Sequence, residues 1–406
     1  MPRPPPGVRR GALPRRRFLA TVAATLALPH VARGWSGSVD AALFGVRADG
    51  VTDNAPALNA AIEAMAGAGG TLRLAPGRYR LGRTVWLKSG ITLAGPGATL
   101  FADTRWVAGE AGARVSRYAL LANRNAGAAG LTDRDIAVRG LGFEYGGPVR
   151  GDAHAVTFRR AEGITVSECQ FSGGGNGTAF LACRATLVER CVSQGTVNCA
   201  YDHWEGSSDG IVRDSRAACR LGYGILFTGQ GTARTDHQTA AGLQALNNRI
   251  ETPGPAAIWV CSLSEGSAVT DVVVRGNHVQ AGPQPGSGIG GTGAIRRMRL
   301  EGNTIEGMQG GNPLFSRTDK WHRPADIAII GNRLVGCTMA PRNIALIQAL
   351  GDRVTVTGNR ATGGSYRSLV WADGEGVRLA DNHGDGLTSR FKYNAAAARA
   401  PRIDDP

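Results

Sequence analysis

The densest group of chemically active side chains in this 406-residue chain lies between Asn198 and Gly210, in the sequence NCAYDHWEGSSDG. It combines a phenol, an imidazole, an indole and three carboxylates, from Tyr201, His203, Trp204, Asp202, Glu205 and Asp209. Imidazole titrates near neutral pH, and carboxylates and phenols can exchange protons with a substrate. This stretch is therefore the first candidate for a catalytic site.

A second group of polar residues follows in a loop between residues 229 and 242. It contains Arg234, Asp236 and His237. Long loops on one face of a repetitive fold often form the wall of a binding groove. We expect this loop and the first stretch to face each other across such a groove.

The two groups contain what β-elimination of a uronic acid requires: a base for the C5 proton, an acid for the leaving oxygen and a donor for the carboxylate. His203 or His237 could be the base, and Arg234 could hold the carboxylate. The acid and a ring-stacking surface could come from Tyr201, Tyr223 and Trp204.

Other interpretations of the same residues remain open. Asp202 with Glu205 or Asp209 could serve glycoside hydrolysis, in which the carboxylate separation determines the stereochemistry. Asp209 could instead be a turn residue. No spaced run of acids or cysteines indicates a metal, and we expect neither a metal nor a cofactor.

A repeat runs through the chain from residue 136 onward, with marker positions 22 to 33 residues apart. Each unit is an alternating apolar strand that ends in a small polar residue. Such units bury their inward residues only against their neighbours, which is typical of a parallel β-helix. The marker residues are expected to form a hydrogen-bonded ladder along the axis; they are Cys169, Cys191, Ser215, Asn248, Asn277, Asn303, Asn332, Asn359 and Asn382.

The two ends of the repeat need covering, because a solenoid exposes its terminal strands. An amphipathic helix over residues 55–66, with Asp53 as its N-cap, is predicted to cover the first coil. The sequence thus predicts an all-β, single-stranded parallel β-helix over residues 41–388. Residues 389–406 are predicted to be a helical or disordered tail.

Residues 1–34 have the pattern of a twin-arginine signal peptide, with Arg15-Arg16-Arg17 before a short apolar run. We therefore expect the export machinery for folded proteins as a partner and a periplasmic or secreted location. No stretch is long enough to span a membrane. The seven cysteines are expected to be mostly buried, with at most one or two disulfides.

The net charge of +14 includes seven arginines in residues 1–34, which leaves the rest of the chain at about +7. A basic exported protein suits an acidic polysaccharide as partner. No nucleic-acid-binding module is visible, so nucleic acid is not an expected partner.

Three segments, FGVRADGVTDNAPALNAAIEA, GGTLRLAPGRYRL and LKSGITLAGPGATL, together resemble the start of the pectate-lyase-like superfamily. That resemblance implies a right-handed parallel β-helix and, for many members, action on uronic-acid polysaccharides. Mannuronan C5-epimerases of this superfamily carry an Asp-Pro-His-Glu motif after an aromatic residue. Residues 201–205 are similar but lack the proline, and Tyr223 stands where those enzymes have an acid.

These departures argue against an epimerase, and the paired-aspartate signature of polygalacturonases is not recognisable. The sequence favours a polysaccharide lyase. A glycoside hydrolase, a C5-epimerase and a non-catalytic polysaccharide-binding or cell-surface β-helix are the alternatives.

Overall fold

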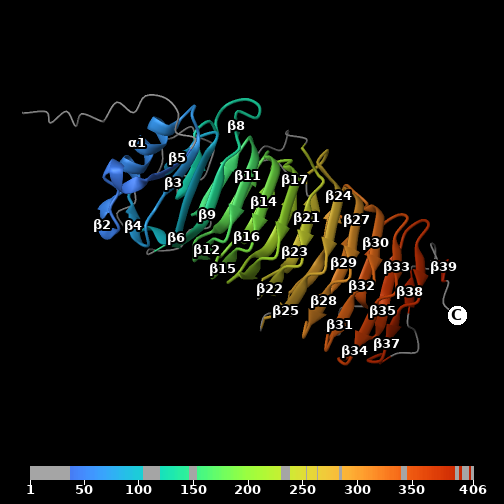
Figure 1. Cartoon of the computed structure of the whole chain (residues 1–406). Coiled ribbons are helices and arrows are strands. Elements are labelled where there is room, and N and C mark those ends of the chain that lie inside the picture. Colours follow the sequence, from blue (N-terminus) through green and yellow to red (C-terminus); the bar gives the residue numbers. More distant parts are fainter. Residues whose placement is uncertain are drawn as a thin grey trace, which may run out of the picture. The chain divides into compact units, whose positions relative to one another are not determined.

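The computed structural model describes residues 37–103, 119–145, 153–229, 238–252, 254–262, 264–282, 286–339, 345–388, 393–395 and 402–403. Most of these residues belong to two sheets of parallel strands, wound as successive coils (Figure 1). This is the right-handed parallel β-helix that the repeat and the resemblance predicted.

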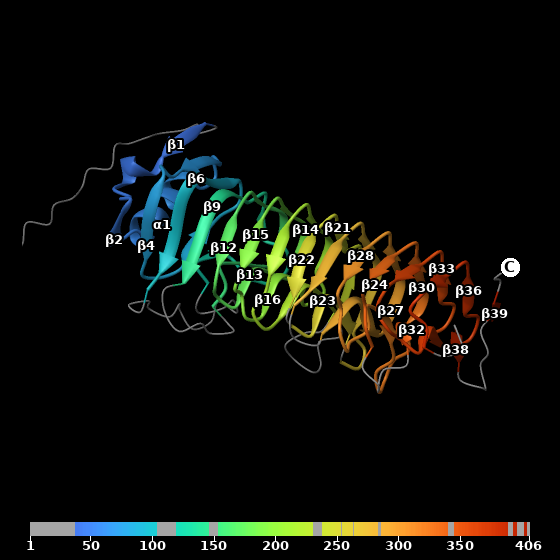
Figure 2. The ribbon, with the colours of Figure 1, turned by 90° about the horizontal axis from the view of Figure 1, so that it is seen from below.

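Each coil gives one strand to a 12-stranded sheet, in which the strands follow one another in chain order (Figure 2). Its strands are β5 (Val85–Leu87), β7 (Leu121–Asn123), β10 (Val156–Arg159), β13 (Asn176–Leu181), β16 (Cys199–Trp204), β19 (Tyr223–Thr228), β23 (Ala256–Ser262), β26 (Ser287–Gly293), β29 (Leu314–Arg317), β32 (Ala345–Leu350), β35 (Ser368–Asp373) and β38 (Tyr393–Ala395).

The rest of each coil forms a bent 27-stranded sheet with two segments per coil. The first segments are β8 (Asp133–Arg134), β11 (Ala161–Ser167), β14 (Arg184–Glu189), β17 (Ser208–Arg213), β20 (Thr239–Ala241), β21 (Gln244–Leu246), β24 (Ala268–Arg275), β27 (Ile295–Glu301), β30 (Ala325–Ile330), β33 (Thr355–Thr357), β36 (Arg378–Ala380) and β39 (Arg402–Ile403).

The second segments lie beyond the bend. They are β12 (Gln170–Ser172), β15 (Val192–Gln194), β18 (Arg216–Ala218), β22 (Arg249–Thr252), β25 (His278–Ala281), β28 (Thr304–Glu306), β31 (Arg333–Val335), β34 (Arg360–Thr362) and β37 (His383–Gly384). Near the N-terminus, β6 (Ile91–Ala102) and β9 (Ala137–Tyr145) pass through both segments. At the N-terminal end, β1 (Ser38–Asp40), a 3-10 turn (Ala41–Phe44) and β2 (Asp49–Asp53) form one coil. The next coil contains β3 (Gly70–Arg73) and β4 (Gly77–Leu81), which pair with β1 and β2.

The core is a set of rows, because parallel register places equivalent residues of successive coils one above the other. One such row contains Val166, Val188, Val212, Ala245 and Val274, which pair in register and are fully buried. Each row buries apolar surface only against the coils next to it, as in other solenoids.

The predicted ladder is confirmed at the bend between the two segments. The Nδ2 group of Asn303 donates to Oδ1 of Asn332 at 3.0 Å, and Oδ1 of Asn303 accepts from the backbone N–H of Asn277 at 2.9 Å. The same pattern continues through Asn359 to Asn382. Ser215 extends it toward the N-terminus, because its backbone N–H donates to Asn248 Oδ1 at 3.1 Å.

The ends of the β-helix agree only partly with the sequence prediction. Helix α1 (Ala55–Met65) buries Leu58, Ile62 and Met65 at the N-terminal end, and the Asp53 carboxylate accepts the backbone N–H of Ala55. The prediction of a helical or disordered tail is wrong for the described residues 393–395 and 402–403. These pair in parallel with β35 and β36, because the chain continues the coil register there.

All seven cysteines lie among the described residues, and all are buried free thiols. Several of the thiols donate hydrogen bonds to backbone carbonyl oxygens, as the amides of the asparagine ladder do. The thiol of Cys191, for example, donates to the Val166 carbonyl oxygen at 3.6 Å. The structure therefore gives them the role of small buried side chains, without disulfides.

Replacing Asn303 by Ala should lower the free energy of unfolding by about 3 kcal/mol, because it leaves buried backbone and amide groups of the neighbouring coils unpaired. Denaturant unfolding would measure the loss. Gln280→Ala, which removes an exposed amide one coil away, is the control and should change stability by less than about 0.5 kcal/mol. Equal effects of the two substitutions would contradict a stabilising ladder.

Candidate functional site

The chemically dense stretch forms strand β16, in the middle of the 12-stranded sheet between β13 and β19. Side chains of a strand point alternately to its two faces. The stretch is therefore divided between the core and the outer face, instead of lining one groove.

His203 and Tyr201 point into the core, so the prediction that they line an outer groove is wrong. His203 is 0% exposed and lies in register with Phe180 and Phe227, whose rings are 4.8 and 5.4 Å from its own. Tyr201 is 1% exposed, and its hydroxyl donates to the Arg216 carbonyl oxygen at 2.7 Å. Both are core residues whose polar atoms made them resemble site residues in the sequence.

The His203 imidazole is held neutral by its surroundings. Burial lowers its pKa to about 3. Its Nε2 lies 2.7 Å from the Thr186 hydroxyl, while its buried Nδ1 has no partner among the described residues. A base with so low a pKa, enclosed by rings, cannot take a proton from a substrate at neutral pH.

Glu205 does not line the expected groove either, because it is buried in an ion pair. Its Oε2 lies 2.9 Å from Nε and 2.8 Å from Nη2 of Arg159, and both side chains are almost fully buried. A buried pair of this kind is costly to break. Arg159, which no sequence pattern marked, lies on β10, two strands away from β16.

Asp209 does not belong to this part of the molecule. It is exposed, lies on β17 of the 27-stranded sheet and has a φ of 53°. It is thus a bend residue rather than a second carboxylate for the site. Trp204 ends β16 and is partly exposed.

Asp202 lies between Tyr201 and His203 and so points to the opposite, outer face. Its Oδ2 accepts a 3.1 Å hydrogen bond from the Asn176 amide, whereas its Oδ1 is buried without a partner among the described residues. Asp202 is only 3% exposed, and this burial raises its pKa to about 7. A carboxyl with that pKa and an unsatisfied oxygen is a common feature of catalytic sites.

Aromatic side chains lie on the strands beside Asp202. Tyr223 on β19 stacks against Trp259 on β23, with ring centroids 4.9 Å apart, and both are partly exposed. Trp259 is in register with Leu226, which is in register with Asp202. Burial raises the pKa of the Tyr223 phenol to about 12, so it stays protonated at neutral pH. Asn176 was missed because only the coil register brings it to Asp202, and Trp259 because only the register places it in the same row, two strands away.

The remaining predicted site residues, Arg234, Asp236 and His237, lie outside the described residues and stay predictions. Within the described part, no group of three His, Cys, Asp or Glu side chains could hold a metal ion. None of the described helices is both long and apolar enough to cross a membrane.

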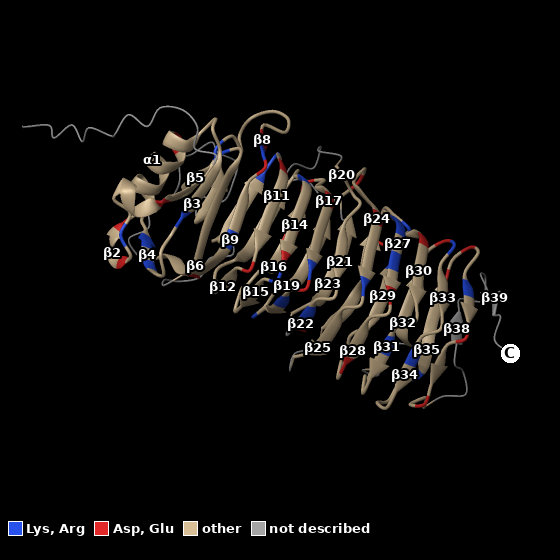
Figure 3. Ribbon diagram, viewed as in Figure 1, with Lys and Arg blue, Asp and Glu red and all other residues tan. Residues whose placement is uncertain are grey.

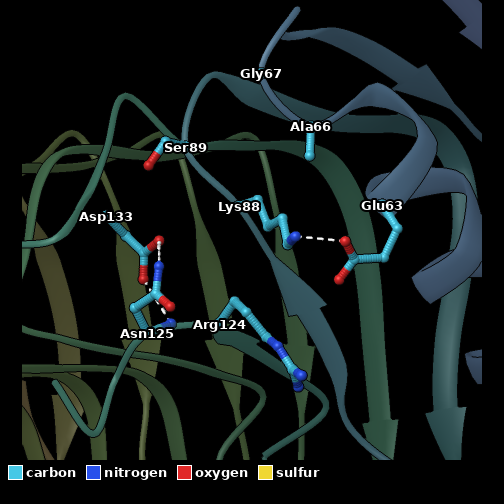
Figure 4. A pocket seen from close by; sticks show the side chains of 8 residues that line it. All are labelled: Glu63, Ala66, Gly67, Lys88, Ser89, Arg124, Asn125 and Asp133. Atoms are coloured by element: carbon cyan, nitrogen blue, oxygen red, sulfur yellow. Dashed lines mark hydrogen bonds and ion pairs between the residues drawn. The ribbon is translucent and has the colours of Figure 1, made fainter.

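A separate pocket lies where α1 meets the first coils (Figure 4). Lys88 in its wall is ion-paired with Glu63, and Asn125 donates to Asp133 at 2.9 Å. These four groups are therefore already paired with one another. The pocket is therefore a weaker candidate than the outer face around Asp202.

Comparison with known proteins agrees with this architecture. Residues 38–119 match a family model described as rhamnogalacturonase A/epimerase, pectate lyase-like. The chain therefore has the right-handed parallel β-helix fold, and its first coils are similar to that family. No curated protein sequence matches the chain.

Among solved structures, the surface adhesin PfbA of Streptococcus pneumoniae has a TM-score of 0.70 at 14% identity, covering 91% of this chain and 96% of the adhesin. The A-module of the Azotobacter vinelandii mannuronan C-5 epimerase AlgE4 has a TM-score of 0.61 at 15% identity, covering 90% and 99%. A family 28 exopolygalacturonase of Yersinia enterocolitica has a TM-score of 0.59 at 14% identity, covering 90% and 79%. At these identities the likeness is one of fold, and the fold carries enzymes as well as an adhesin.

Replacing His203 by Phe should leave any enzymatic activity within about twofold of the parent, because the ring only fills the core. The imidazole has a pKa near 6.5 when unfolded and about 3 when folded. The unfolded state therefore binds the extra proton, and this group lowers stability as the pH falls below 6.5. Thermal unfolding between pH 7 and pH 4 should show a smaller loss of stability in the variant. A pH dependence like the parent's, or inactivation of a folded variant, would contradict a core role.

Replacing Asp202 by Asn should raise stability above pH 7. The carboxyl has a pKa of about 7 when folded and 3.8 in its unperturbed state. The folded state therefore binds the proton more tightly, and its stability from this group decreases as the pH rises from 4 to 7. The variant should lack this decrease and gain up to about 4 kcal/mol at pH 8. Equilibrium unfolding of both proteins at pH 5 and pH 8 measures the difference, and a less stable variant at pH 8 would contradict the burial argument.

Proposed function

We propose that this protein cleaves an acidic polysaccharide by β-elimination, with its reaction centre on the outer face of the 12-stranded sheet at Asp202. The observation that supports it most is the buried Asp202 carboxyl, with its raised pKa and with an Oδ1 that has no partner among the described residues. Burying an unpaired carboxyl is costly. The pectate-lyase-like fold gains nothing from that cost, since neighbouring coils have Ala179 and Leu226 at this position.

In the proposed reaction, the Asp202 carboxylate removes the proton from C5 of a uronate residue. The C4–O bond then breaks, a C4–C5 double bond forms, and the Tyr223 phenol gives its proton to the departing glycosidic oxygen. Trp259, stacked on Tyr223, would support the sugar ring. Arg234 remains the sequence-based proposal for the group that holds the substrate carboxylate.

The lyase is favoured over a hydrolase because hydrolysis needs two carboxyl groups flanking the bond. Among the described residues proposed for that role, Glu205 is ion-paired with Arg159 and Asp209 lies on the other sheet. Neither residue can therefore act with Asp202 as the second carboxyl group that hydrolysis needs. A C5-epimerase would use the same proton abstraction, and product analysis distinguishes the two.

A non-catalytic polysaccharide-binding protein is the second candidate. It is supported by the low exposure of Asp202, which a substrate must reach, and by the partly exposed rings of Tyr223, Trp259 and Trp371 on the same sheet. Aromatic faces can bind sugars without any chemistry. In either case, export through the twin-arginine pathway stays a proposal from residues 1–34.

Incubation of the protein with a panel of uronic-acid polysaccharides would separate these functions. New ultraviolet absorbance together with new reducing ends identifies a lyase, and reducing ends without absorbance identify a hydrolase. Altered uronate composition without cleavage identifies an epimerase. Binding without any product identifies a non-catalytic protein and would overturn the lyase proposal.

In the lyase, Asp202→Asn should lower kcat by about 10³-fold while leaving the fold intact, because a positioned base contributes that much. The rate of the parent enzyme should rise with pH and level off above about 7, as the carboxyl ionises. Rates of cleavage measured from pH 5 to 9 test both points. His203→Phe is the matched control from the same strand; an Asp202→Asn variant as active as this control would exclude Asp202 as the base.

A further inference from the structure

A row of basic side chains runs along the 27-stranded sheet, one residue after the ladder. The residue following each ladder residue opens the second segment of its coil, and these residues pair in register from coil to coil. From β18 onward the row, here called the basic row, consists of Arg216, Arg249, His278, Thr304, Arg333, Arg360 and His383. Figure 3 marks basic positions on β22, β31 and β34.

The row faces outward and brings like charges together. Arg216 is paired in register with Arg249, and Arg333 with Arg360, on strands about 4.8 Å apart. All four are exposed. Like charges directly opposite each other destabilise a sheet. The fold therefore bears a cost along this row that it does not need for its core.

Arginines on other faces of the same β-helix are treated differently. Arg213 pairs with Glu189 at 2.6 Å. Arg297 is paired with Asp271, and Arg353 with Asp326, on neighbouring coils, each at 2.6 Å. Among the described residues, no carboxylate lies within ion-pair distance of the four arginines of the basic row; the row's one such contact is His278 with Glu306 at 3.2 Å. The three arginines named above are thus neutralised by acids on neighbouring coils, whereas the four of the basic row have no carboxylate partner among the described residues; Arg249 instead donates to Gln280 Oε1, at 3.5 Å.

The surface is hollowed at the N-terminal end of the row, at Arg216 and Arg249. One hollow is lined from β6, β9, β12 and β15 and includes Gln170 and Glu144; a second is lined from β15, β18 and β22 and includes Arg216 and Arg249. The two share Val192 and Gln194, so they form one groove. It crosses six strands, which is about 24 Å at the spacing of a sheet.

We propose that this groove and the basic row bind an acidic polysaccharide chain lying along the β-helix axis, at a site separate from Asp202. The arginines would pair with the carboxylates of successive sugar residues. Gln194, Glu144 and Glu251 offer acceptors for sugar hydroxyls. A nucleic acid fits less well, because the outward groove positions offer no exposed ring for a base. The proposal does not depend on the reaction at Asp202.

The test compares two double variants of equal charge. Arg216→Gln with Arg249→Gln removes two arginines of the basic row, and Arg297→Gln with Arg353→Gln removes two exposed, ion-paired arginines from the first segments of the same sheet. Binding to immobilised alginate and polygalacturonate is measured at several salt concentrations, with dextran as the neutral polymer and duplex DNA as the competing polyanion. The basic-row variant should bind the uronans about tenfold more weakly or worse, with a reduced salt dependence.

The control variant should stay within about twofold of the parent. The basic-row variant should melt no lower than the parent, because it loses like-charge repulsion. It should also keep the parent's activity on short oligouronides, whereas Asp202→Asn should keep the polymer affinity. Equal weakening by both double variants, no weakening by the basic-row variant, or tighter binding of DNA than of the uronans would overturn the proposal. A parent without cleavage activity would refute the lyase and leave this binding test intact.

Discussion

The pairing of each coil with the next is the interaction on which the whole structure depends. Parallel hydrogen bonds fix the register, and register turns every position of the repeat into a row that runs along the axis. The ladder from Asn248 to Asn382 keeps that register at the bend, where backbone groups would otherwise lack partners. Because the rows are fixed, a single residue type repeated in the sequence becomes a surface or a core feature in the structure.

This constraint explains which parts of the fold could be predicted. The ladder was readable because Gly-Asn recurs at the end of an apolar strand, at spacings of one coil. The orientation of His203 could not be predicted, because polar and apolar residues do not alternate clearly along its strand, CAYDHW. Only the register with Phe180 and Phe227 shows that an aromatic row passes through position 203 and that its imidazole replaces a phenyl ring.

Prediction of the candidate site from the sequence was limited for the same reason. Asp202 was recognised from the residues next to it in the sequence, yet its hydrogen-bond partner Asn176 lies 26 residues away and carries no local signal. Glu205 looked like a free acid because its partner Arg159 lies 46 residues earlier. In a solenoid, residues that meet on a face are separated by whole coils of varied length. A local motif therefore identifies a strand, and coil alignment is needed to identify a site.

The outer faces differ in how they treat charge, and this difference separates stability from function. Where an arginine faces an acid one coil away, as Arg297 faces Asp271, the pair is neutral and the coils are held together. At Asp202 and along the row from Arg216 to Arg360, charges or polar atoms are kept without such partners. Natural proteins bear local costs of this kind mainly where a ligand or a reaction supplies the missing interaction. The site at Asp202 would then act on a single sugar residue, and the basic row would recognise the periodic charge of a polymer. A repeating fold can carry both sites because the residues on its outer faces can change without changing its core.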